Sequence, residues 1–143
     1  MPSKVDNALL LHEQKFNCAQ AVFASFAPEL GVGETEALKA AAGFGGGMGR
    51  LQETCGAVTG ALMVLGSRHG MVQPGDTAAK EETYARVQEF VRKFREIHGT
   101  ISCRDLLRCD LNTPEGMAYY KEKDLGAAVC AECIRSACLL LED

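Results

Sequence analysis

The sequence lacks a hydrophobic run long enough to cross a membrane. Its longest nearly apolar stretch, Cys55 to Gly66, has 12 residues, whereas a membrane-spanning helix needs about 20. The first residues, MPSKVDNALLLHEQ, contain no apolar stretch of signal-peptide length. We therefore expect a cytoplasmic protein without membrane insertion, in a compartment that keeps thiols reduced.

An excess of positive charge is missing as well. Lys and Arg number 15 against 19 for Asp and Glu, which gives a net charge of −4. Nucleic acids and anionic membranes attract basic surfaces, so this balance argues against both as partners.

No segment shows the alternation of apolar and polar residues that strands require, and there is no linker or internal repeat. In Thr77 to His98, apolar residues recur at three- and four-residue steps, which predicts one long amphipathic helix. The other expected helices cover about 3–15, 18–27, 36–42, 54–66 and 125–141. Because 143 residues suit one domain, we expect a single all-α domain over residues 1–143, a compact bundle of five to seven helices.

The glycines concentrate in one place, the stretch GFGGGMG at residues 43–49. This stretch predicts a loop before the buried helix that begins at Thr54, with backbone conformations that other residues avoid. No register gives GxGxxG, no GKS/T is present and no strand precedes the loop, which argues against a nucleotide site. The loop instead allows close backbone packing against a cofactor. The candidate cofactor-contacting positions are Gly45, Gly46, Gly47 and Gly56.

The chain has 7 cysteines, a share below the roughly 8–10% that marks a disulfide scaffold. An odd number also leaves one thiol over. In a reducing compartment, cysteines used this often are more typical of metal ligands or redox groups than of structural disulfides. Some can still be small core residues.

Three cysteines, Cys18, Cys55 and Cys103, directly follow an Asn, Thr or Ser, residue types that cap helix N-termini. We expect each of these thiols in a first helical turn. The free backbone N–H groups and the helix dipole favour negative charge there, so the thiols should lose their protons more easily. The thiolate is the form that binds metals and attacks disulfides.

Cys130 and Cys133 form a CxxC motif, with Cys138 five residues further on. The motif lies inside a predicted amphipathic helix and does not follow a strand, which argues against a thioredoxin-like site. Ile134 stands where covalent haem attachment needs His, so no c-type haem is expected. A second CxxC is absent, which disfavours a zinc ribbon or finger. A four-cysteine site would have to be assembled from distant helices.

Several segments, in order, resemble the C_GCAxxG_C_C family of small soluble bacterial and archaeal proteins, to which a redox role is attributed. They are NCAQAV (17–22), FGGGMGR (44–50), TCGAVTGA (54–61), CRDLL (103–107), DL (110–111), TPEG (113–116) and Cys130 with Ile134, Arg135 and Ala137. The resemblance implies four defining cysteines, which correspond to Cys18, Cys55, Cys103 and Cys130.

The remaining cysteines, Cys109, Cys133 and Cys138, lie outside the family pattern. Cys133, beside Cys130, is a candidate resolving thiol or alternative ligand, and Cys138 is expected in the core. Without a metal, the four family cysteines would themselves be the redox-active groups.

Three chemistries could use four converging cysteines. An iron–sulfur cluster uses about four Cys ligands and gains from backbone N–H groups near its sulfurs. Zinc would accept the same thiolates without redox chemistry, and a dithiol pair needs only two cysteines whose Cα atoms lie about 5.5 Å apart. We favour an iron–sulfur cluster for electron transfer or redox sensing, because four ligands and a glycine loop exceed what a dithiol requires.

No acid–base constellation is visible, so an electron-transfer or redox protein with a redox partner protein is favoured over a substrate-converting enzyme. An exposed apolar helix face would imply a homodimer.

Overall fold

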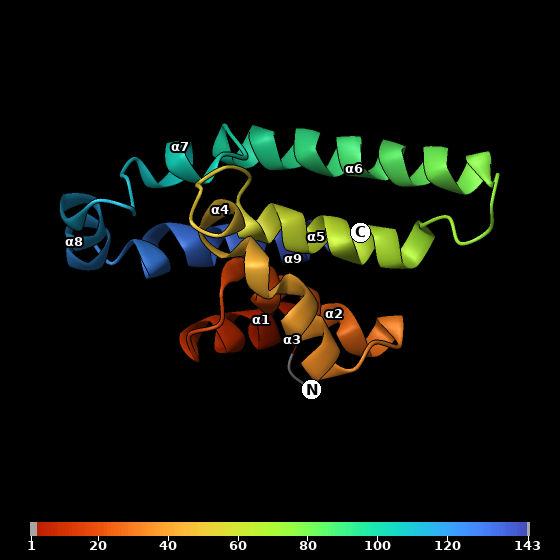
Figure 1. The fold of residues 1–143 in the computed structure, drawn as a ribbon, viewed down its shortest axis with the longest axis horizontal. Coiled ribbons are helices and arrows are strands. Elements are labelled where there is room, and N and C mark those ends of the chain that lie inside the picture. Colours follow the sequence, from red (N-terminus) through yellow and green to blue (C-terminus); the bar gives the residue numbers. More distant parts are fainter. Residues whose placement is uncertain (1–2, 143) are drawn as a thin grey trace.

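The computed structural model describes residues 3–142, and within them every regular element is a helix (Figure 1). The helices are α1 (Lys4–Glu13), α2 (Cys18–Leu30), α3 (Glu34–Ala41), α4 (Gly45–Met48), α5 (Gly56–His69), α6 (Thr77–His98), α7 (Cys103–Leu107), α8 (Pro114–Glu122) and α9 (Ala131–Leu141). A 3₁₀ turn, η1 (Ala42–Phe44), precedes α4, and a π-helical turn, η2 (Gly126–Cys130), precedes α9. The predicted all-α class is confirmed for this part of the chain.

The number of helices exceeds the predicted five to seven. Element α4 contains two glycines in left-handed conformation and is a tight turn, which leaves eight regular helices in residues 3–142. The helix that the sequence pattern misses is α8. Its nine residues begin at Pro114, and the hydroxyl of Thr113 accepts a hydrogen bond from the backbone N–H of Gly116. Gly116 is the one residue of α8 that is buried, so this helix has no apolar stripe that a sequence pattern could reveal.

The predicted caps at Asn17 and Ser102 are present. The side chain of Asn17 accepts from the N–H of Gln20, and Ser102 accepts from Asp105, so α2 and α7 begin at Cys18 and Cys103. These two thiols therefore lie in a first helical turn, as expected.

The predicted place of Cys55 in a first helical turn is wrong, because Cys55 is itself the N-cap of α5. Thr54 pairs with Ser102 in an isolated antiparallel bridge. The N–H of Cys55 donates to the carbonyl oxygen of Ile101 at 2.7 Å. This pairing keeps residues 54 and 55 extended, so the helix starts later than the cap pattern suggests.

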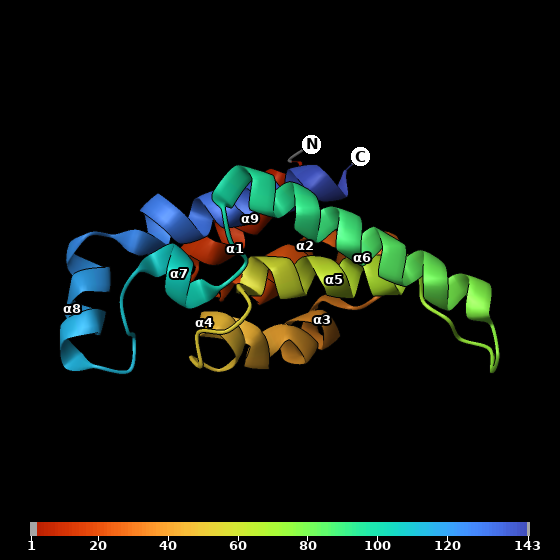
Figure 2. The same cartoon turned by 90° about the horizontal axis from the view of Figure 1, so that it is seen from above.

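The core lies around α5, which packs against α2, α6 and α9. Figure 2 shows α5 between α6 on one side and α3 with α4 on the other. The largest fully buried side chains include Phe26 from α2, Phe94 from α6 and Ile134 from α9. In residues 3–142 no helix combines the length and the apolar character that crossing a membrane requires.

Candidate functional site

A cavity of about 1200 Å³ lies where the starts of several helices meet. Five cysteines line it: Cys18 at the start of α2, Cys55 at the cap of α5, Cys103 at the start of α7, Cys130 in η2 and Cys133 in α9. The fold thus brings the four cysteines of the family pattern to one place, together with Cys133.

The glycine loop forms one wall of this cavity. Gly45, Gly46, Gly47 and Gly56, the four glycines singled out from the sequence, all line it. Gly47 has a φ of +69°, and a β-carbon there would lie 2.6 Å from the Cβ of Cys103 and 2.7 Å from the Cα of Gln52. Only glycine fits such a contact, so the loop sets how closely α7 approaches the cavity.

Cys18 and Cys130 form the pair that we call the outer pair, and both side chains are half-buried. The thiols of Cys18 and Cys130 share a hydrogen bond that shifts the pKa values of both. This bond, together with burial, raises the pKa of Cys18 well above its usual range. The same bond, with a further one from Tyr120, lowers the pKa of Cys130. Cys130 is therefore the thiol of this pair that ionises first.

Cys55 and Cys133 form the inner pair, with side chains only 6% and 1% exposed. A hydrogen bond from the Cys133 thiol lowers the pKa of Cys55, and the backbone N–H groups of Ala57 and Val58 at the start of α5 act in the same direction. The same bond from Cys133, followed by burial, raises the pKa of Cys133. The predicted stabilisation of a thiolate by a helix N-terminus is thus present at Cys55.

A helix N-terminus does not control the ionisation of Cys18 and Cys103, the other two cysteines that follow a capping residue. The pKa of Cys18 is raised, and burial raises the pKa of Cys103 to about 12. The prediction that a first-turn position makes these thiols more acidic is wrong, because the hydrogen bond to Cys130 and the loss of water outweigh the helix terminus.

Gln52 is a site residue that the sequence does not reveal. Its side chain hydrogen-bonds to Cys103 and lowers the pKa of that thiol, against the larger effect of burial. Its Nε2 also donates to the carbonyl oxygen of Cys109, and its Oε1 accepts from the N–H of Leu111, both at 2.8 Å. Gln52 is 3% exposed and has a φ of +57°. It ties the loop that follows α7 to the cavity wall.

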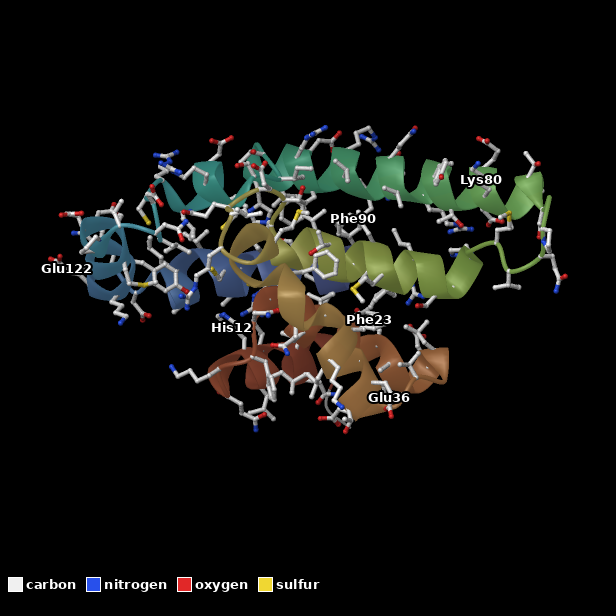
Figure 3. All side chains as sticks on the ribbon, in the orientation of Figure 1. His12, Phe23, Glu36, Lys80, Phe90 and Glu122 are labelled. Carbon is white, nitrogen blue, oxygen red and sulfur yellow. The ribbon has the colours of Figure 1, made fainter. Side chains whose placement is uncertain are left out.

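Tyr120 and His12 also line the cavity, from α8 and α1. The hydroxyl of Tyr120 lies 3.9 Å from the sulfur of Cys130. Burial, followed by the nearby Cys130, raises the pKa of this phenol. Burial is also the main reason that the pKa of His12 is lowered, so this imidazole, labelled in Figure 3, is neutral at physiological pH. No spacing in the sequence connects either residue with the cysteines.

The two remaining cysteines do not reach the cavity lining. Cys138 is fully buried on α9, where burial raises its pKa to about 12, in line with its predicted place in the core. Cys109 is half-buried in the loop after α7, and burial raises its pKa as well.

Four of the cysteine sulfurs that could bind a metal are arranged as two pairs, the outer pair and the inner pair. In residues 3–142, no group of three or more His, Cys, Asp or Glu side chains could hold a metal ion. As placed, the side chains therefore offer no three-donor group for a zinc ion, although the four family cysteines and Cys133 line one cavity. The predicted cluster stays a prediction.

The comparisons with known proteins agree with the resemblance seen in the sequence. The family profile described as "Putative redox-active protein (C_GCAxxG_C_C)" matches residues 16–143. An uncharacterized protein of Archaeoglobus fulgidus is 32% identical over 105 residues, which cover 68% of this chain and 68% of that protein. No solved structure matches the chain.

Proposed function

Because the chain belongs to the C_GCAxxG_C_C family of redox-active proteins, we propose that it exchanges electrons through its paired cysteine thiols. The observation that supports this proposal is the contact within each pair. Cys18 hydrogen-bonds to Cys130, and Cys133 hydrogen-bonds to Cys55. Two thiols that interact directly can be joined as a disulfide when their Cα atoms lie about 4.4–6.8 Å apart.

The outer pair is the one that meets external molecules, because its side chains are half-buried while those of the inner pair are buried. Cys130 has the lowered pKa, and the thiolate is the attacking form in thiol–disulfide exchange. We therefore assign Cys130 as the nucleophile and Cys18 as the resolving thiol. Cys18 donates its proton toward Cys130 in the reduced state, which keeps the two sulfurs together.

The exchange balances with a disulfide X–S–S–X as oxidant. The Cys130 thiolate attacks one sulfur, a Cys130–S–X bond forms and X–S⁻ leaves to take a proton from solvent. Cys18 then attacks the Cys130 sulfur, its proton passes to the second X–S⁻, and the Cys18–Cys130 disulfide forms. Two protein thiols lose two electrons, and one external disulfide becomes two thiols. The reverse sequence reduces the Cys18–Cys130 disulfide and oxidises two external thiols to a disulfide.

The test is to oxidise the reduced protein with excess bis(2-hydroxyethyl) disulfide and quench it with acid. Thiols are then counted and the linked peptides identified by mass spectrometry. We expect two thiols to disappear first, with a Cys18–Cys130 link. Cys18→Ser should stop at the mixed disulfide on Cys130, and Cys138→Ser, the control, should behave as wild type. An unchanged count of 7 free thiols after prolonged oxidation would contradict the proposal.

An iron–sulfur cluster in the same cavity is the second candidate. It is supported by the cavity lining, where the four family cysteines stand beside the glycine loop, whose N–H groups could reach cluster sulfurs. Binding would require the paired side chains to turn toward one centre.

The measurement that separates the two candidates is a visible spectrum of protein purified without oxygen, with analysis for iron, zinc and acid-labile sulfide. Iron with sulfide and absorbance near about 400 nm would support the cluster. That absorbance should be lost in Cys18→Ser, Cys55→Ser, Cys103→Ser and Cys130→Ser but kept in Cys138→Ser. Zinc without sulfide would indicate a structural site, and colourless metal-free protein would leave the dithiol proposal.

A further inference from the structure

The charged residues around the cavity carry a positive excess, although the chain has a net charge of −4. Two carboxylates, Glu13 and Asp124, line the cavity. The cations that line it number four: Lys15, Arg50, Lys121 and Arg135. All six side chains are exposed, so they surround the mouth of the cavity while the cysteines lie deeper.

Most of these cations have no carboxylate within ion-pair distance in the part of the chain that the structure describes. Arg135 lies 3.6 Å from Glu132. Within residues 3–142, Lys15, Arg50 and Lys121 form no ion pair. Elsewhere on the surface, as along α6, arginines pair with glutamates one turn away. Free cations at the mouth of a cavity concentrate anions and speed their arrival.

The backbone around the mouth is strained. Lys15, Arg50 and Asp124 have φ values of +79°, +65° and +49°. Left-handed backbone is uncommon outside glycine and is strained for residues that carry a side chain. Six non-glycine residues of the described chain have this conformation, and these three all line the cavity. Such clustering is typical of functional sites and here concerns charged residues at the mouth.

The cavity also has the size and lining of a small-molecule site. Its volume of about 1200 Å³ is slightly above the range of about 300–1000 Å³ that is usual for ligand pockets. Leu107, Leu111, Met117 and Val129 supply apolar lining in the same cavity as the charged residues and the thiols. A ligand that fits has a short apolar stem, a reactive sulfur at its deep end and negative charge at its outer end.

We propose that the molecule that exchanges with the outer pair is a low-molecular-weight disulfide, or its thiol, that carries carboxylates. This inference rests on the proposed dithiol function and names its substrate class. The carboxylates lie among Lys15, Arg50 and Lys121, and one disulfide sulfur meets Cys130. Cys18 and Cys130 are oxidised to a disulfide, and the substrate disulfide is reduced to two thiols that keep their carboxylates.

The experiment compares three symmetrical disulfides of similar length. They are 3,3′-dithiodipropionate, which is anionic, bis(2-hydroxyethyl) disulfide, which is neutral, and cystamine, which is cationic. The rate of loss of the first two protein thiols is measured with each. It is divided by the rate of the same disulfide with a small reference thiol, so that leaving-group chemistry cancels. We expect the normalised rate to be at least about tenfold higher for the anionic disulfide than for the neutral one, and lowest for cystamine.

Salt and substitutions at the mouth test the electrostatic origin of this preference. In 0.5 M salt the Debye length falls to about 4 Å, so the anionic-to-neutral ratio should approach one. Lys15→Gln and Lys121→Gln should each lower this ratio by about two- to fivefold. Lys80→Gln is the matched control and should leave the ratio unchanged, because Lys80 lies near the start of α6, away from the cavity (Figure 3).

The outcomes separate the two levels of the proposal. If none of the three disulfides oxidises the outer pair, the dithiol function fails and the substrate class fails with it. If all three oxidise it with equal normalised rates, only the substrate class is overturned. A protein would then be the favoured partner for the thiol–disulfide exchange. A ratio that exceeds one but does not respond to Lys15→Gln, Lys121→Gln or salt also overturns the inference.

Discussion

The hydroxyl of Tyr120 lies 3.9 Å from the sulfur of Cys130. Tyr120 comes from α8 and Cys130 from the π-helical turn before α9, so the contact joins two segments separated by a bend of the chain. After the bond from Cys18, the hydrogen bond from Tyr120 is the second interaction that lowers the pKa of Cys130. A phenol in this position stabilises the thiolate without itself ionising, because burial and the nearby Cys130 raise its own pKa.

Tyr120→Phe should therefore raise the pKa of Cys130. At pH 7.5 a smaller fraction of the thiol is ionised, so we expect iodoacetamide to modify Cys130 about two- to fivefold more slowly. At pH 10 the difference should shrink. Tyr119→Phe is the control, since Tyr119 is 44% exposed and does not line the cavity. Equal rates for Tyr120→Phe and wild type at pH 7.5 would show that the hydroxyl does not act on this sulfur.

The cysteines should also differ from one another in their pH profiles. A lowered pKa means that the thiolate forms at lower pH, so the modification rate of Cys130 should reach half its maximum below the ordinary pKa of 9.0. Cys103 and Cys138, whose pKa values are raised to about 12, should react late and only at high pH. Peptide mapping after brief alkylation between pH 6 and pH 9 gives the order. Modification of Cys103 before Cys130 would refute it.

Local patterns predicted the parts of the fold that local interactions determine. The helix expected over Thr77 to His98 is found with those bounds, because one apolar stripe, the Asp76 cap and the left-handed Gly99 all act within a few residues. The first-turn position of Cys18 is predictable for the same reason. Its neighbour Asn17 forms a reciprocal capping box with Gln20.

Contacts between distant segments could not be predicted in this way. The start of α5 depends on Thr54 pairing with Ser102, and no periodicity encodes that pairing. The sequence shows Cys133 only as a neighbour of Cys130 in a CxxC, whereas in the fold it interacts with Cys55. The acidity of each thiol depends on such partners and on burial, so the cap pattern could indicate where Cys18 and Cys103 lie but not how they ionise.

Gln52→Ala should destabilise the fold and expose the thiols beside it. The change removes the hydrogen bonds to the carbonyl of Cys109 and the N–H of Leu111 and leaves polar backbone groups without partners. We expect the free energy of unfolding to fall by about 2–4 kcal/mol, measured by urea denaturation. Cys103 should then be alkylated faster. Gln88→Ala, on the exposed face of α6, should stay within about 0.5 kcal/mol of wild type.

Two glycines of α5 should respond to alanine in opposite directions. A β-carbon at Gly60 would lie 2.8 Å from the carbonyl oxygen of Ala19 and 3.1 Å from its Cα. Gly60→Ala would push α2 and α5 apart, and we expect a loss of about 1–3 kcal/mol. At Gly66 a β-carbon meets nothing within 4 Å, so Gly66→Ala should stabilise the helix by about 0.5–1 kcal/mol. Both values come from urea unfolding monitored by circular dichroism.

Because Cys18 adjoins Ala19 on α2, Gly60→Ala should also slow disulfide formation in the outer pair. A Gly60→Ala protein as stable as Gly66→Ala would mean that α2 and α5 do not approach as closely as this packing requires.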